Sequence, residues 1–183
     1  MRRIFVAHVE DKPGVLNRVA SLFRRRAFNI ESLTVGHTEK PGVSRMTIVV
    51  DTDELGARRV EANLYKLVNV LRVEELHEAD AVVSEIALIK VSADASNRTQ
   101  VLQLVDVFQA RIVDVANESL MVEVTGQRET IRRLVDVLRP IGIVEMVRTG
   151  VVAMARGTAK PIERASVMRD DEADDIGGTA MSV

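Results

Sequence analysis

The sequence contains no cysteine among its 183 residues. Disulfides, thiolate zinc sites, iron–sulfur clusters and cysteine nucleophiles are therefore all excluded. A chain that forms no disulfide fits a reducing compartment, and we expect it in the cytoplasm.

An excess of one charge and long apolar runs are also missing. The 25 Lys and Arg residues stand against 27 Asp and Glu residues, which gives a formal net charge of −2. This balance provides no strong attraction to nucleic acid or to an anionic membrane. No apolar stretch approaches the roughly 18 residues that a membrane span needs. The start, Met1-Arg2-Arg3, leads straight into a short apolar run without a secretory-signal pattern. We therefore expect a soluble protein.

Motifs of catalytic sites are scarce as well. The sequence has no phosphate-binding loop, no G-x-G-x-x-G and no G-x-S-x-G motif. Its three histidines, His8, His37 and His77, are far apart in sequence and lie in or beside expected strands, which disfavours a metal site. Adjacent carboxylates such as Glu74 and Glu75 point to opposite sides of a strand, so they do not form an acid/base pair. An enzyme is therefore the least supported class.

The hydrophobic pattern that is present repeats one order of elements twice. Apolar runs of strand length alternate with segments whose apolar residues recur at helical spacing. In the first half, strands are expected at 3–10, 29–38, 43–51 and 70–77, with helices at 15–28 and 60–68. In the second half, strands are expected at 84–92, 111–116, 120–125 and 141–148, with helices at 101–108 and 131–138. Each half therefore has the order β-α-β-β-α-β.

This order predicts an α+β fold made of two ferredoxin-like modules. In each module, two helices pack on one face of a four-stranded antiparallel sheet. The boundaries that we expect are 1–78 and 79–157. Residues 158–183 have no apolar periodicity and include the acidic run 170–175. We expect a disordered tail there, with an acidic partner-binding arm as the alternative.

The strands carry apolar residues on both faces of each expected sheet. Examples are the runs Ile4-Phe5-Val6-Ala7 and Ala87-Leu88-Ile89. The helices cover one face, so the other must be covered by the second module or by another copy of the chain. A homodimer is our default expectation.

One loop has the chemistry of a binding site. Between the first strand and the first helix, the backbone N–H groups of Gly14, Val15 and Leu16 are expected to form a nest for a carboxylate. Asp11 can cap this helix or accept a hydrogen bond from an ammonium group, and Asn29 offers an amide that both donates and accepts. A free amino acid would need such groups. The competing interpretation is that Asp11 to Gly14 form only a turn and a helix cap.

Several motifs resemble the small regulatory subunit of acetolactate synthase (acetohydroxyacid synthase). The most specific combination is NIESLTV at 29–35 followed by SRMTI at 44–48, with DKPGVL at 11–16. The likeness continues through YKLVNVLRV at 65–73, IALIKV at 86–91 and RTGVVAMARG at 148–157. It covers residues 1–157 and leaves the tail outside.

The resemblance implies an N-terminal ACT domain, which is an amino-acid-sensing module, and a second ACT-like domain. Members of this family activate a separate catalytic large subunit that carries thiamine diphosphate, Mg²⁺ and FAD, and no cofactor is expected in this chain. They bind valine between two ACT domains and confer feedback inhibition on the synthesis of valine, isoleucine and leucine. Leucine and isoleucine are alternative effectors.

Carried over to this sequence, the effector site would combine two chains. Asp11, Gly14, Val15 and Leu16 would come from one chain, and Asn29 and Ile30 from its partner. Some relatives that respond to valine have asparagine in place of Asp11, and the extra negative charge here is expected to weaken valine binding. The alternative function is a stand-alone ACT-type sensor that controls a different enzyme.

Overall fold

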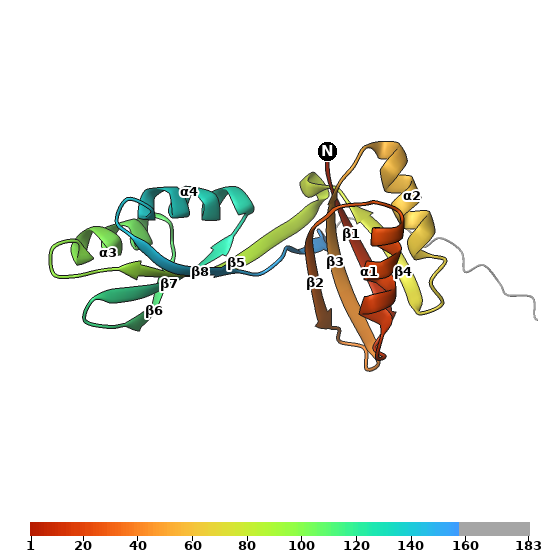
Figure 1. Ribbon diagram of the computed structural model, residues 1–183, viewed down its shortest axis with the longest axis horizontal. Helices are drawn as coiled ribbons and strands as arrows, with labels where there is room; N and C mark the ends of the chain where they lie inside the picture. The colour runs from red at the N-terminus through yellow and green to blue at the C-terminus, as the bar shows by residue number, and fades with distance from the viewer. Residues whose placement is uncertain (158–183) are drawn as a thin grey trace, which may run out of the picture.

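The computed structural model describes residues 1–157 and arranges them in two modules, side by side along the longest axis (Figure 1). The tail, predicted to be disordered, lies outside the described residues. The first module contains β1 (Arg2–Glu10), α1 (Val15–Arg25), β2 (Ile30–His37), β3 (Val43–Asp51), α2 (Glu54–Leu64) and β4 (Val70–Leu76). The second contains β5 (Ala81–Ser92), α3 (Arg98–Val107), β6 (Arg111–Val115), β7 (Ser119–Gly126), α4 (Arg128–Leu138), β8 (Ile143–Arg148) and β9 (Val152–Ala155). A short 3-10 helix, η1 (Glu78–Asp80), joins the modules.

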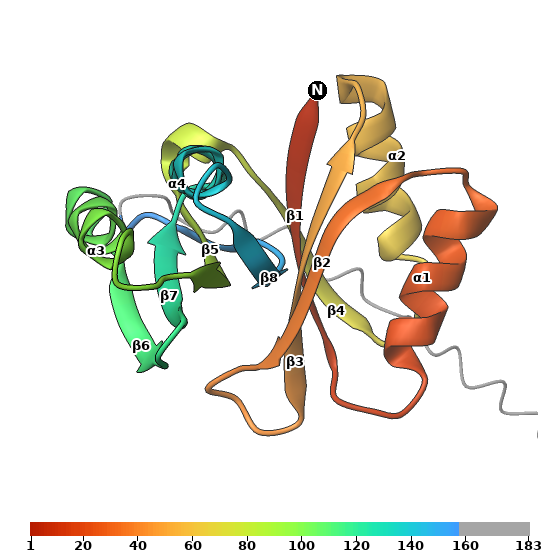
Figure 2. The same ribbon diagram turned by 60° about the vertical axis from the view of Figure 1, so that its left-hand side comes forward.

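Both sheets are antiparallel, with strand orders β2-β3-β1-β4 and β6-β7-β5-β8. In each module the two helices lie on one face of the sheet (Figure 2). This confirms the predicted α+β fold with two ferredoxin-like units. None of the helices in residues 1–157 is long and apolar enough to cross a membrane.

The core of the first module lies between its helices and its sheet. Every second side chain of β1 points toward the helices, because successive side chains of a strand point to opposite faces. These side chains are Phe5, Ala7 and Val9. They pack against residues of α1 that recur at helical spacing, including Val19 and Phe23. The second module repeats this packing around Ala87, Ile89 and Val91 of β5.

A two-stranded ribbon covers the other face of the first sheet. The first four residues of β5 pair with β9, from Ala81 opposite Ala155 to Ser84 opposite Val152. The apolar side chains of the ribbon and of the sheet form a buried cluster of Ile4, Val6, Val49, Leu76, Ala81, Val151 and Ala153. We expected this face to be covered by the second module or by another copy of the chain, and the ribbon of the same chain covers it.

The hydrophobic pattern does not predict β9, and it predicts that β5 begins at Ser84 rather than Ala81. Both differences have one cause. The two short segments become strands by pairing with each other across about 70 residues of chain, and no local periodicity reports such pairing.

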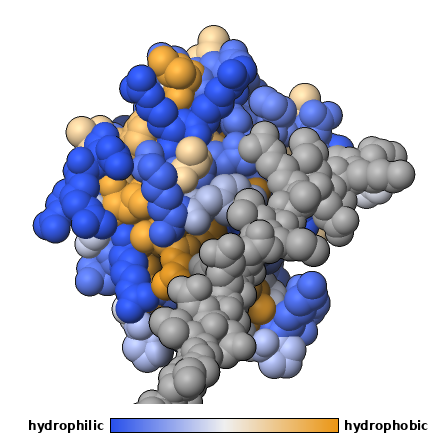
Figure 3. Space-filling model, turned by 90° about the vertical axis from the view of Figure 1, so that its right-hand side faces the viewer, coloured by the Kyte–Doolittle hydropathy of each residue, from blue (hydrophilic) through white to orange (hydrophobic). Residues whose placement is uncertain are grey.

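The open face of the second sheet keeps apolar side chains in contact with solvent. Leu88 and its cross-strand neighbour Val147 lie opposite the helices, and Val147 is 59% exposed. Ile86, on the same face, is 42% exposed. The outer side of the first module shows mainly hydrophilic residues with apolar patches among them (Figure 3).

Candidate functional site

The loop from Asp11 to Gly14 is held by backbone hydrogen bonds at the end of β1. The N–H of Asp11 donates to the carbonyl oxygen of Gly42, in the turn between β2 and β3, at 2.8 Å. Gly14 occupies the N-cap position of α1 with φ of 84°. This left-handed conformation favours glycine, because a side chain there is strained. Nothing lies within 4 Å of a Cβ built at Gly14, so the space in front of it is open.

The prediction that Asp11 caps α1 is wrong. Gly14 is the N-cap, and no side chain accepts a hydrogen bond from the first turn. Asp11 lies three residues too early for that role. Its carboxylate is instead 3.3 Å from Nδ1 of His37, at the end of β2.

The predicted nest of three N–H groups is reduced to two of them. Val15 N–H donates to the carbonyl oxygen of Lys12 at 3.3 Å, whereas Gly14 N–H and Leu16 N–H have no partner within residues 1–157. Two free donors at the positive end of an 11-residue helix still suit a carboxylate. The structure therefore leaves two N–H donors at this position, and Val15 contributes a buried side chain instead of a donor.

A buried asparagine, which the sequence analysis did not single out, forms hydrogen bonds on both sides of the loop from Asp11 to Gly14. Asn69, before β4, donates from Nδ2 to Oε2 of Glu10 at 2.5 Å and accepts at its backbone oxygen from Glu10 N–H at 2.9 Å. Its Oδ1 accepts a hydrogen bond from the Arg18 guanidinium of α1. The hydrogen bond from Asn69 lowers the pKa of the Glu10 carboxyl. Asn69 thus ties the strand before the loop to the helix after it. Its single amide within the apolar run 67–71 is the signal that identifies it.

The two halves of the predicted site lie at opposite ends of one module. Glu10, which precedes the loop, pairs with Val43 at the start of β3, whereas Ile30 pairs with Val50 near its end. Seven residues of extended strand separate these levels by about 23 Å. Asn29 is exposed and Ile30 is partly buried against the core. One chain therefore does not bring Asn29 and Ile30 to the Asp11 loop.

The histidines offer no metal site within residues 1–157, where no group of three or more His, Cys, Asp or Glu side chains converges. His8 lies on the ribbon-covered face of β1, beside Arg45 of β3 and Arg72 of β4. Burial, followed by the charge of Arg45, lowers the pKa of its imidazole. His37 lies at the end of β2 and contacts Asp11.

Two family models match the chain, one over each module. The AHAS small subunit-like ACT domain matches residues 5–72, and the small subunit of acetolactate synthase matches residues 84–157.

Relatives with the same name match both modules together. The acetolactate synthase small subunit of Mycolicibacterium smegmatis is 50% identical over 149 residues, which cover 81% of this chain and 88% of the relative. The probable acetolactate synthase small subunit of Archaeoglobus fulgidus is 48% identical over 160 residues, 87% of this chain and 100% of the relative. The crystal structure of the small subunit from Thermotoga maritima has a TM-score of 0.83 at 38% identity and covers 87% of this chain and 99% of its own. The chain therefore belongs to the family of acetolactate synthase small subunits, as its motifs predict.

Proposed function

We propose that the chain is a non-catalytic regulatory subunit that activates a catalytic large subunit of acetolactate synthase and makes it sensitive to valine. Thiamine diphosphate, Mg²⁺ and FAD belong to that partner, and this chain carries no cofactor. The complex acts in the cytoplasm, in the synthesis of branched-chain amino acids. The family assignment supports the partnership, and the geometry of the first module supports the sensing role.

The observation that carries this proposal is the division of the site between the two ends of one sheet. β2 is an edge strand of the first sheet, so its backbone is free to pair with another strand. Antiparallel pairing of two β2 strands around a two-fold axis would place Ile30 of one chain beside His37 of the other. Because His37 contacts Asp11, this pairing would complete two identical sites in a homodimer.

Each group of an amino-acid ligand has a counterpart in such a site. The ligand carboxylate accepts hydrogen bonds from the N–H groups of Gly14 and Leu16. Its ammonium group donates to the Asp11 carboxylate and takes the place of His37 there. Asn29 of the second chain contributes an amide to either group. The half-exposed side chain of Leu16 and the edge of Ile30 provide apolar contact for a branched side chain such as that of valine.

The function is tested by adding the chain to its large subunit and measuring acetolactate formation from pyruvate. We expect the rate to rise on addition of the chain, and then to fall on addition of valine. The chain alone, given pyruvate and thiamine diphosphate, is expected to give no product. Product from the chain alone would indicate an enzyme. Valine binding without any effect on the large subunit would indicate a sensor for a different enzyme.

The two-chain site predicts complementation between two inactive variants. Gly14→Asp damages the loop, and Asn29→Ala damages the opposite half. A mixed dimer would still hold one site in which the loop and the Asn29 amide are both intact. Calorimetry on a re-equilibrated equal mixture should therefore recover about a quarter of the wild-type valine sites, since half of the random dimers are mixed. Recovery of none would show that both groups act within one chain or that the dimer has another geometry.

A further inference from the structure

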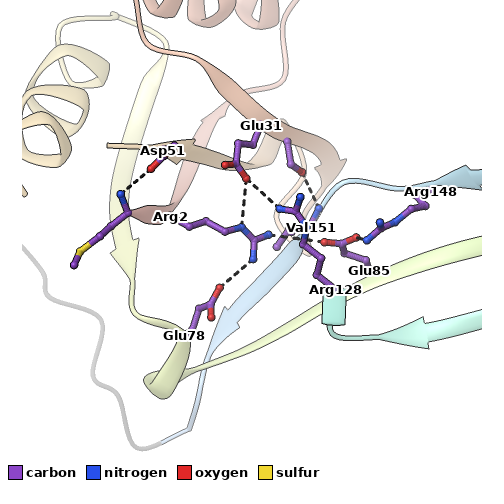
Figure 4. Close-up of polar contacts among 10 residues, drawn as sticks. Arg2, Glu31, Asp51, Glu78, Glu85, Arg128, Arg148 and Val151 are labelled. Carbon is purple, nitrogen blue, oxygen red and sulfur yellow. Dashed lines mark hydrogen bonds and ion pairs between the residues drawn. The ribbon is translucent and has the colours of Figure 1, made fainter. Parts of the chain in front are cut away.

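A network of six charged side chains joins the two modules (Figure 4). Its members are Arg2, Glu31, Glu78, Glu85, Arg128 and Arg148, and Arg2 at its centre pairs with all three carboxylates. Three guanidinium groups face three carboxylates, so the network is neutral as a whole. It borders a cavity of about 350 Å³ between the modules. The side chains therefore have room to change partners.

Glu31 is the carboxylate of β2 that links both modules. Its Oε2 accepts a hydrogen bond from Nη1 of Arg128, the first residue of α4, at 3.2 Å. The same oxygen is 3.7 Å from Nε of Arg2, in its own module. That Nε is buried and has no hydrogen-bond partner within residues 1–157. A buried donor without a partner is unfavourable, so Arg2 offers Glu31 a second place to bind.

A β-bulge sets the direction of Glu31. Ile30 pairs with Val50 and Ser32 with Val49, which leaves Glu31 as the extra residue between two consecutive positions of β3. Bulges re-aim side chains and are frequent beside functional sites. This bulge immediately follows Asn29 and includes Ile30, the two residues that would contact the effector. A ligand that fixes Asn29 and Ile30 therefore acts directly on the conformation that aims Glu31.

Arg128 is available to Glu31 because the neighbouring carboxylate is already engaged. The Arg132 and Arg133 guanidinium groups lower the pKa of Glu129 to about 2, through hydrogen bonds within α4. Glu129 therefore stays ionised and bound to its own helix in neutral solution. Nothing within residues 1–157 other than Glu31 forms an ion pair with Arg128.

The residue after Glu31 holds the second module as well. Ser32 Oγ accepts a hydrogen bond from Val151 N–H at 2.9 Å, just before β9. A side chain at Gly150 would collide with the hydroxyl oxygens of Ser32 and Thr34, so the chain passes close to β2 at this point. The start of β2 is therefore fixed to the second module at α4 and again at β9.

We propose that Glu31 is a coupling residue, which exchanges its hydrogen bond between Arg128 of the second module and Arg2 of the first when an effector binds at Asn29 and Ile30. This inference rests on the proposed valine site. In one state Glu31 binds Arg128, as observed. In the other it satisfies the buried Nε of Arg2 and releases α4, which changes how the second module is held. The exchange gives the effector two discrete states to choose between.

The test uses Glu31→Gln, with Glu75→Gln as a matched control. Glu75 pairs with Arg3 at 2.9 Å inside the first module, and its side chain is 24% exposed against 29% for Glu31. In the complex with the large subunit, Glu31→Gln should still bind valine in calorimetry, but its inhibition at saturating valine should fall about fivefold or more. Glu75→Gln should respond like the wild type. Arg128→Gln, which removes the same contact from the second module, is the alternative if Glu31→Gln does not fold.

A structural readout separates coupling from general damage. Because the chain has no cysteine, nitroxide labels can be attached at Ala62→Cys on α2 and at Ala95→Cys before α3, in chains diluted with unlabelled copies. Valine should shift or narrow the distance distribution between these labels in the wild type and not in Glu31→Gln. Wild-type inhibition and wild-type label response in Glu31→Gln would overturn the coupling role alone. Absence of valine binding to the wild-type complex would overturn both this role and the proposed function.

Discussion

Gly14→Asp is expected to weaken valine binding by at least about tenfold. The new carboxylate would stand in front of the N–H groups of Gly14 and Leu16. These groups have no hydrogen-bond partner within residues 1–157 and are proposed to bind the ligand carboxylate. Two like charges about 4 Å apart repel by roughly 4 kcal/mol at the effective dielectric constant of a protein surface. Solvent and salt screen part of this repulsion. The remaining effect still exceeds the 1.4 kcal/mol or so that corresponds to tenfold in affinity. Calorimetric titration with valine measures it.

Gly14→Asn is the control for this variant. Gly14 has a φ of 84°, and asparagine and aspartate both adopt this left-handed conformation more readily than other side chains. The two variants have nearly the same size and backbone strain and differ in charge. We expect Gly14→Asn to bind valine much more tightly than Gly14→Asp. An equal loss of valine affinity in both variants would mean that valine needs the open space at Gly14 and does not bind to the N–H groups. If Gly14→Asp folds and binds valine as tightly as the wild type, the loop at Gly14 is not part of the valine site.

The repeated order of elements could be predicted from sequence because the strands are short apolar runs and the helices carry apolar residues at helical spacing. On β1, Phe5 and Ala7 face the helices, and Ile4 and Val6 face the ribbon. These local patterns fix most strands and helices to within a few residues, although α2 begins at Glu54, six residues before the expected start. They say nothing about β9, which becomes a strand by pairing with Ala81–Ser84 over a long stretch of chain.

The sequence indicates which residues belong to the candidate site, but it does not indicate which of them contact one another. The loop at Gly14 was recognisable because a helix start and a glycine are local features. The partnership of Asp11 with His37, and of Asn69 with Glu10 and Arg18, depends on which strands become neighbours. Wherever tertiary pairing decides the partner, residue type alone indicates only that a partner is needed.

The charged network between the modules is also where we expect the largest loss of stability from a single polar substitution. Glu85 of β5 is buried, with 8% of its side chain exposed, and pairs with Arg148 of β8. In Arg148→Met, Arg2 remains 3.8 Å from the Glu85 carboxylate. Removing one member of a buried ion pair costs about 3–5 kcal/mol, because the other charge stays desolvated. We expect the melting temperature to fall by about 6–20 °C, since each 1 kcal/mol corresponds to about 2–4 °C in a chain of this size.

A more exposed Arg–Glu pair serves as the control that distinguishes the effect of burial on stability from that of charge attraction alone. Arg111 and Glu123 are 2.7 Å apart on the same sheet, with 72% of the Arg111 side chain exposed. Arg111→Met should therefore cost about 0–1 kcal/mol. The double variant Glu85→Leu with Arg148→Met should recover most of the lost stability, because it removes the buried charge together with its partner. Calorimetric melting of all three variants measures the difference. Equal losses in Arg148→Met and Arg111→Met would mean that the Glu85 carboxylate is too well hydrated for its burial to matter.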